Sequence, residues 1–332
     1  MSDSEQALKD INPLPEKLSS EEKHGNLYKG NFSIPRDENS KNLKDGLGII
    51  PTSLVSSTTD DGGTHSIPDI AVSEVEYIES ENLDDLLSVE SNISTLAERL
   101  NCKDWVLVCE ALNNVRQLSI YHKEKLMGIL DEILKLIVKC LKNPRSAVCK
   151  TAIMTSSDIF KAYNDSIIES FDPLLYQLFL KSSQDKRFVC EAAERTLITM
   201  ITCFSSLMLL PKIQPYLKHK NPRIRAKASM CFCGSVQSLG MDGIQIYGID
   251  KLIEVAITQL HDQLPESREA ARSLALKVKE AYEKSQPPVV ETGDSDSVCK
   301  LSWEDFCQSK LSALDAQAIL RATCVVKENA PV

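Results

Sequence analysis

A short polar turn that carries a basic residue, followed at once by small and apolar residues at helical spacing, recurs along this chain. The clearest copies are residues 143–152, 185–193 and 221–228, and residues 265–272 are a looser fourth copy. Their arginines, at positions 145, 187, 223 and 268, are 42, 36 and 45 residues apart. A self-similar unit of about 40 residues is the period of solenoids built from paired helices. The sequence therefore predicts a repeat protein.

The apolar pattern divides residues 83–285 into about five helical hairpins. Apolar residues recur at helical spacing on both sides of each polar turn, and Asn143-Pro144 and Gly240 are placed to end helices. Aromatic residues make up only 5% of the chain, which suits helix-on-helix interfaces because Ala, Leu, Ile and Val fill them. The predicted fold class is all-α, an α-solenoid. Its expected helix pairs are residues 83–100 with 106–118, 124–140 with 148–160, 171–180 with 189–204, 207–217 with 224–239, and 249–260 with 268–282.

Three further segments flank this predicted array. Residues 1–82 are acidic and polar, contain scattered prolines and have no sustained apolar period, so we expect them to be disordered. Residues 286–300, which begin with a proline pair, are predicted to be a linker. Residues 301–325 are expected to form one isolated amphipathic helix, with Ser302 as its N-cap and Trp303 among its apolar residues.

Charge is segregated along the chain. Residues 1–100 carry 8 Lys or Arg against 20 Asp or Glu, whereas residues 101–285 carry 26 against 20. The predicted array is therefore mildly basic, and a basic surface suits an acidic partner. The 11 Cys form no regular framework and the N-terminus resembles neither a secretory nor a transit signal, which favours reduced thiols in the cytosol or nucleus. The most apolar run, residues 196–210, is too short for a bilayer, so no membrane span is expected.

Basic residues gather in the turns between the two helices of each pair. Equivalent turns line up along one edge of such a stack, so these side chains are predicted to form a row of cations with an indole at its N-terminal end. Trp and Arg are enriched at binding hot spots, and a row of Lys and Arg suits an extended acidic surface. The competing interpretation is that these are ordinary solvated turn residues, because a helix C-terminus favours cations. The candidate partner-binding residues are Trp105, Lys103, Lys142, Arg145, Lys186, Arg187, Lys220, Arg223 and Arg268.

The turns also carry a family resemblance. Asp104-Trp105 in the first turn, and the Asn-Pro-Arg and Asp-Lys-Arg-Phe-Val patterns that open later second helices, make residues 85–285 resemble a TOG domain, the tubulin-binding array of HEAT repeats, and most of all its CLASP-type branch. A TOG domain usually has six repeats, whereas five are counted here. The resemblance implies a cytoskeleton-associated protein that regulates microtubule organisation. It implies that the turns face tubulin, with Trp105 as the apolar anchor and Arg145, Lys186, Arg187, Lys220 and Arg223 as its cationic neighbours.

The sequence carries no catalytic or cofactor-binding pattern. Its glycines do not fall in a phosphate-cradling spacing, its five His are dispersed, and Cys231-Phe232-Cys233 has no second pair at zinc spacing. We therefore expect a non-catalytic protein without metal, cofactor or small-molecule substrate. One alternative to tubulin binding is a general HEAT scaffold that binds a protein or peptide in its concave groove. Nucleic-acid binding is disfavoured, because the excess of 26 basic over 20 acidic residues is small and few aromatic side chains are present to stack on bases.

Overall fold

The structure is a computed structural model that describes residues 77–286 and 301–324. The predictions for residues 1–76 and for the linker at 287–300 lie outside the described residues. The described residues all belong to one compact unit, and the description that follows concerns this unit by itself.

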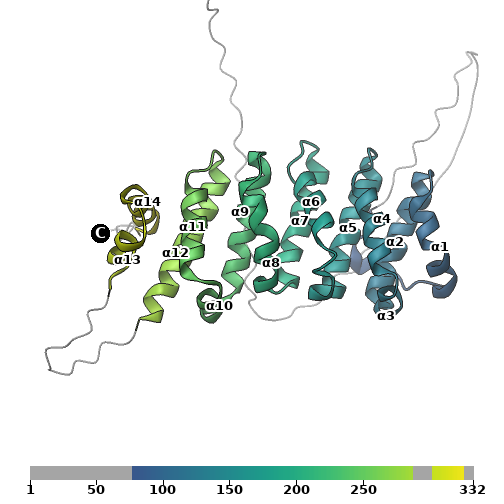
Figure 1. The fold of residues 1–332 in the computed structure, drawn as a ribbon. Helices are drawn as coiled ribbons and strands as arrows, with labels where there is room; N and C mark the ends of the chain where they lie inside the picture. The colour runs from purple at the N-terminus through teal and green to yellow at the C-terminus, as the bar shows by residue number, and fades with distance from the viewer. Residues whose placement is uncertain (1–76, 287–300, 325–332) are drawn as a thin grey trace, which may run out of the picture. The chain divides into compact units, whose positions relative to one another are not determined.

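Five helical hairpins form the body of the unit in the described ranges, and the same ranges contain no strand (Figure 1). This confirms the predicted all-α solenoid. The first helices of the hairpins are α1 (Val89–Asn101), α4 (Leu130–Leu141), α6 (Asp172–Lys181), α8 (Ser206–Ile213) with the 3-10 helix η3 (Gln214–Lys218), and α11 (Ile249–Leu260). The second helices are α2 (Trp105–Tyr121), α5 (Ser146–Tyr163), α7 (Arg187–Cys203), α9 (Pro222–Ser238) and α12 (Pro265–Ser285).

The second helices pack side by side, α2 against α5, α5 against α7 and α9 against α12. One interaction repeats from hairpin to hairpin. The Thr155 hydroxyl of α5 donates to the Leu112 carbonyl of α2, and the Thr196 hydroxyl of α7 donates to the Ile153 carbonyl of α5, each at 3.3 Å. The donor and the acceptor of the second hydrogen bond each lie 41 residues after those of the first. The repeat seen in the sequence is therefore also a repeat of contacts.

Apolar stripes supply most of the packing. In α4, Ile133, Leu134, Ile137 and Leu141 recur at three- and four-residue spacing and are almost fully buried. Full burial of one such side chain stabilises the fold by about 1.5–3 kcal/mol. The cysteines in the described ranges are all free thiols. Nowhere in these ranges is a helix long and apolar enough to cross a bilayer.

Short helices that the sequence pattern did not separate connect the hairpins. The run at 124–140, expected as one helix, is interrupted at Gly128, because glycine is a poor helix former and ends α3. Gly240 has a φ of +69°, a left-handed conformation that suits glycine, and α9 ends beside it as predicted. The connecting elements are η1 (Ser80–Asn82), α3 (Lys123–Met127), η2 (Asn164–Ile167) and α10 (Gly240–Tyr247).

The prediction of a disordered segment up to residue 82 is wrong for its last residues. Residues 77–83, which we call the strap, lie on the second helices α2 and α5. The Arg116 guanidinium donates to the Ile78 carbonyl at 2.8 Å, and the Ser80 hydroxyl donates to the Asp158 carboxylate at 2.6 Å. Arg116 and Asp158 themselves form an ion pair at 2.7 Å, with both side chains 1% exposed. Hydrophobic periodicity misses such a segment, because polar partners rather than an apolar stripe hold it in place.

The prediction of one isolated C-terminal helix is also wrong, because this region forms two helices that pack on the array. The chain breaks at Leu311, where Ser312 begins a second helix by accepting a hydrogen bond from Asp315 N at 3.2 Å. This second helix contacts α11 and α12. The two helices are α13 (Trp303–Lys310) and α14 (Ala313–Thr323).

Aromatic side chains attach this C-terminal hairpin to the last repeat. The ring of Tyr282 in α12 lies 5.5 Å from the ring of Trp303 and 4.4 Å from that of Phe306. The Trp303 indole N–H donates to the Thr323 hydroxyl at 3.1 Å, so α13 and α14 are also tied to each other. The hairpin therefore follows the fifth repeat as a further layer of the stack (Figure 1).

Candidate functional site

The turns between first and second helices lie along one edge of the array, the upper edge in Figure 1. The second helices start from N-cap residues Asp104, Arg145, Lys186, Asn221 and Leu264, which are 41, 41, 35 and 43 residues apart. Contacts between successive turns, described below, show that these residues are spatial neighbours. We call this edge the turn ridge, defined as residues 103–106, 142–146, 185–188, 220–225 and 262–268.

The first two turns bring an indole and a guanidinium together. The Asp104 carboxylate caps α2 by accepting a hydrogen bond from Val106 N at 2.9 Å. Trp105, the next residue, is half-buried against the core, and the Arg145 guanidinium of the second turn lies 5.1 Å from the centre of its ring. Such a cation–π contact is worth about 0.5–1 kcal/mol at an exposed site. It holds an aromatic surface and a positive charge in one place at the N-terminal end of the ridge.

The third turn adds two cations and an exposed ring. The Lys186 ammonium donates to the Ser146 hydroxyl of the second turn at 3.0 Å. The Arg187 guanidinium pairs with Glu191 one helical turn further on at 2.7 Å, and both of these side chains are at least half exposed. Phe188 is 43% exposed, and the Lys150 ammonium lies 5.9 Å from its ring centre. The middle of the ridge therefore also combines positive charge with an aromatic side chain.

The fourth turn is different, because its arginines are bound by carboxylates of neighbouring turns. The Arg223 guanidinium pairs with Asp185 of the third turn at 2.6 Å, and this hydrogen bond raises the pKa of the Arg223 side chain. The Arg225 guanidinium pairs with Asp262 of the fifth turn at 2.5 Å, where the two side chains are 17% and 5% exposed. Burial alone would raise the pKa of the Asp262 carboxyl, but hydrogen bonds from Arg225 and from Leu264 N lower it below its ordinary value.

The fifth turn uses its arginine internally. The Arg268 guanidinium donates to the carbonyl oxygens of Asp262 and Gln263 at 2.9 and 2.8 Å. Both carbonyls belong to the turn that follows the end of α11 at Leu260, so Arg268 stabilises its own turn.

All nine predicted residues lie on the turn ridge, and they differ in what surrounds them. Within the described ranges no ion pair joins Lys103, Lys142 or Lys220 to a carboxylate, and all three are exposed. The prediction included Trp105 but omitted two other apolar residues of the ridge. Val106 and Phe188, which are 39% and 43% exposed, occupy the second position of α2 and α7. An apolar residue at this position of a second helix, directly after a turn, is the sequence signal that identifies them.

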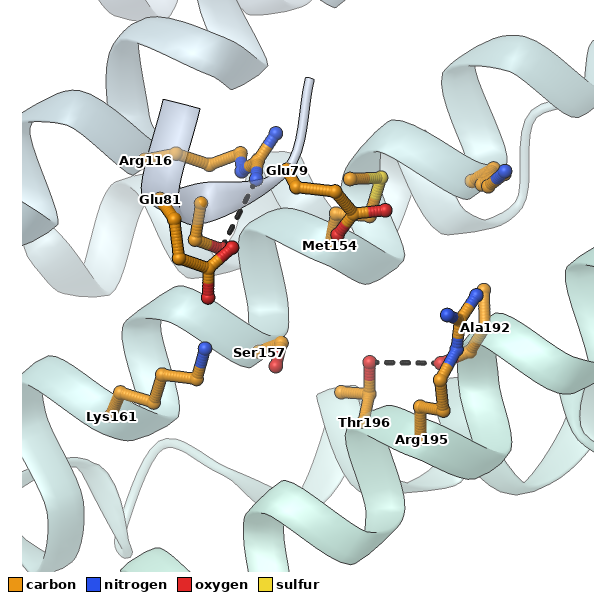
Figure 2. A pocket seen from close by; sticks show the side chains of 11 residues that line it. Glu79, Glu81, Arg116, Met154, Ser157, Lys161, Ala192, Arg195 and Thr196 are labelled. Carbon is orange, nitrogen blue, oxygen red and sulfur yellow. Dashed lines mark hydrogen bonds between the residues drawn. The ribbon is translucent and has the colours of Figure 1, made fainter. Parts of the chain in front are cut away.

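The strap and the second helices enclose a separate pocket of about 150 Å³ (Figure 2). Glu79 and Glu81 of the strap lie on one side, and Met154, Lys161 and Arg195 of α5 and α7 line the rest. No group of His, Cys, Asp or Glu in the described ranges is arranged to hold a metal ion. The pocket lies where the strap rests on the array.

Fold and site together define a class of protein: a helical-repeat scaffold with one exposed edge of cations and aromatic side chains, suited to binding another macromolecule. Residues 113–299, more than half of the chain, match the family described as CLASP N terminal. The chain belongs to this family. Its HEAT-type hairpins make it a TOG-like array, as the resemblance of its turns implied.

Relatives and solved structures place the array among similar proteins. The chain is 30% identical over 99 residues to the human TOG array regulator of axonemal microtubules protein 1, and 29% identical over 99 residues to the mouse protein. Each match covers 30% of this chain and 6% of the relative. The MAST/Orbit N-terminal domain aligns with a TM-score of 0.50 and 14% identity, over 72% of this chain and 96% of that chain. A structure from work on tubulin recruitment by microtubule polymerases with TOG domain arrays aligns with a TM-score of 0.50 and 16% identity, over 73% of this chain and 48% of that chain. These likenesses establish the fold.

Proposed function

We propose that this protein is a non-catalytic binding protein that contacts tubulin through the turn ridge and so regulates microtubule organisation. The observation that carries the proposal is the half-buried Trp105 ring, 5.1 Å from the Arg145 guanidinium, at the head of an edge of exposed cations. Trp and Arg are the residues most enriched at interface hot spots. The name of the curated relatives, regulators of axonemal microtubules, supports tubulin as the partner. A cytoplasmic, cytoskeleton-associated location follows from this proposal.

Co-sedimentation of the full chain with microtubules, together with gel filtration of the chain with unpolymerised tubulin, tests the proposal. Replacing Trp105 by Ala is expected to weaken binding by about five-fold or more, because truncation of a hot-spot residue costs more than about 1 kcal/mol. Leu314→Ala is the matched control, since this apolar residue is 79% exposed but lies on α14, away from the turns. A wild-type chain that neither pellets nor forms a complex would contradict the proposal.

Salt provides a second measurement. Binding through exposed cations weakens as ionic strength rises, because the Debye length falls below about 10 Å above 0.1 M salt. The loss of affinity with salt is expected to be shallower for Arg145→Gln than for the wild-type chain. An equal loss of affinity with salt for the two proteins would show that Arg145 does not contact tubulin.

A second candidate function is a scaffold that binds an extended peptide on the face of the second helices. The strap favours this candidate, because a short segment of this chain already lies on that face through hydrogen bonds of Ser80 and Arg116. The candidate predicts that Arg195→Glu, in the pocket beside the strap, lowers capture of a partner while Trp105→Ala leaves it unchanged.

A further inference from the structure

The strap is held on the second helices partly through its backbone. The Ile78 carbonyl accepts a hydrogen bond from the Arg116 guanidinium at 2.8 Å, and the Leu83 carbonyl accepts one from the Tyr121 hydroxyl at 2.7 Å. Every residue type carries a backbone carbonyl, so any segment that follows the same path offers both acceptors. These two contacts therefore hold a segment at this place without selecting its sequence.

The pocket beside the strap supplies the selection by charge. Lys150 and Lys161 of α5 and Arg195 of α7 line it together with Glu79 and Glu81 of the strap (Figure 2). Lys161 and Arg195 are exposed, and Lys150 is half-buried. Within the described ranges no ion pair joins Lys150 or Arg195 to a carboxylate, and none involves Glu79 or Glu81. The strap thus brings acidic side chains near these cations without pairing with them directly.

The segment that this surface holds is itself acidic. Residues 77–85 contain four Asp or Glu and no Lys or Arg. Carboxylates attract cations across a distance of up to the Debye length, about 10 Å at 0.1 M salt, so direct contact is not needed for this charge to favour docking. The attraction grows as the charges approach each other. A segment whose carboxylates reach Lys150 and Arg195 directly therefore binds this surface more tightly than the strap does.

We propose that this surface of α2, α5 and α7 binds a short acidic segment, which the strap supplies in the free protein and a partner protein supplies in a complex. We call it the strap site, defined as Arg116, Lys150, Lys161 and Arg195. Tethering gives the strap a high effective concentration, so it excludes weakly binding acidic segments. The role of the partner rests on the second candidate function, whose partner chemistry this proposal names. The binding of an acidic segment is measured without that partner.

Fluorescence anisotropy of a labelled synthetic peptide with the sequence of residues 77–86 tests the site. The Glu79→Gln/Glu81→Gln variant of the full chain holds its own strap less tightly. We expect this variant to bind the peptide about three-fold more tightly than the wild-type chain does, since exposed charges contribute only modestly. A peptide with Gln in place of both glutamates is the matched control and is expected to bind more weakly. Equal binding of the two peptides, or no binding of either up to millimolar concentration, overturns the proposal.

Two further variants of the full chain locate the bound peptide. Lys161→Gln/Arg195→Gln, added to the variant with the weakened strap, is expected to lower the affinity for the peptide by about three-fold. Lys135→Gln/Arg321→Gln makes the same change in net charge at exposed positions of α4 and α14, and is expected to leave the affinity unchanged. Equal losses in the two variants would mean that the peptide responds to net charge alone, which overturns the strap site.

Light scattering of the same samples separates a partner protein from a second copy of this chain. We expect the variant with the weakened strap to stay monomeric. A dimer would show that the strap of one copy fills the site of another, and so overturns the assignment to a partner. Peptide binding without any capture of a protein that depends on Arg195 counts against the second candidate function alone. Such capture without peptide binding counts against the acidic segment.

Discussion

The two halves of the turn ridge have a similar spacing between turns, but their cations have different partners. In the first three turns Arg145 lies against an indole and Lys186 against a hydroxyl, and Phe188 is exposed beside them. In the fourth turn Arg223 and Arg225 are paired with carboxylates of the third and fifth turns, and Arg268 of the fifth turn binds carbonyl oxygens of its own turn. A cation already paired within the array has to give up that partner before it can bind another protein. The same repeat unit thus leaves cations available for an external contact in one half and uses them for internal stability in the other.

The halves also differ in where their ion pairs lie. The first half is held by the Arg116–Asp158 pair on the face of the second helices, where both side chains are 1% exposed. The second half is held by the Arg225–Asp262 pair on the ridge itself. In the described part of the first half no buried ion pair involves the ridge, where Arg187 pairs with an exposed glutamate, and each prediction below tests part of this difference.

The largest effect is expected for Asp158→Asn. This change leaves the buried Arg116 guanidinium without a counter-charge, and breaking a buried pair in this way costs about 3–5 kcal/mol. Urea denaturation followed by circular dichroism measures the free energy of unfolding. A loss below about 1 kcal/mol would show that the pair does not hold the first half together.

The next largest effect separates the two halves of the ridge by binding. Arg145→Glu with Lys186→Glu is expected to weaken tubulin binding by about 30-fold or more, because each hot-spot position contributes more than about 1 kcal/mol. Lys220→Glu with Arg223→Glu makes the same charge change in the fourth turn and is expected to weaken binding by about ten-fold or less, because Arg223 is already paired with Asp185. Equal losses in the two double variants would abolish the distinction between the halves.

A smaller, pH-dependent effect is expected for Asp262→Asn. The pKa of the Asp262 carboxyl is lowered in the folded protein, so its contribution to stability is present above the unfolded pKa of about 3.9 and is lost as the pH falls through the folded value. The variant is expected to lose about 1.5–3 kcal/mol of unfolding free energy near neutral pH, the range for a hydrogen bond to a charged group. The difference in unfolding free energy between variant and wild type should disappear towards pH 3, as measured by denaturation at a series of pH values. A difference in unfolding free energy that stays constant with pH would contradict a lowered pKa of the Asp262 carboxyl in the folded protein.

The smallest effect is expected for Asp185→Asn. The Asp185 side chain is 89% exposed, and an exposed pair contributes at most about 1 kcal/mol, so thermal unfolding should hardly change. Tubulin binding is expected to strengthen by about two-fold, because Arg223 is released from its partner. Weaker binding would mean that the Arg223–Asp185 pair holds the ridge in the conformation that binds tubulin.

Much of this molecule follows from local patterns. The helix pairs follow from apolar spacing, and α11 begins at Ile249 and ends at Leu260 as predicted. The row of turns follows from the repeat of the arginines, because equal units stack with equal turns on one side. The family resemblance, carried by Trp105 and the turn patterns, agrees with the family match over residues 113–299.

The features that were missed depend on partners far apart in the sequence. Arg116 and Asp158 are 42 residues apart, and no periodic pattern marks them as a buried pair that anchors the strap. Which ridge cations are paired depends on contacts such as Arg225 with Asp262, 37 residues away. The break between α13 and α14 did have a local signal, since Ser312 repeats the capping arrangement of Ser302 ten residues later.

The aromatic attachment of α13 to α12 has a practical consequence for dissecting this protein. A fragment that stops at residue 299, where the family match ends, would lack Trp303 and Phe306 and so leave Tyr282 facing water. Newly exposed apolar surface of this kind promotes aggregation. Expression boundaries placed beyond Thr323 keep that end of the stack covered, and they allow a failure to bind tubulin to be told apart from a failure to stay soluble.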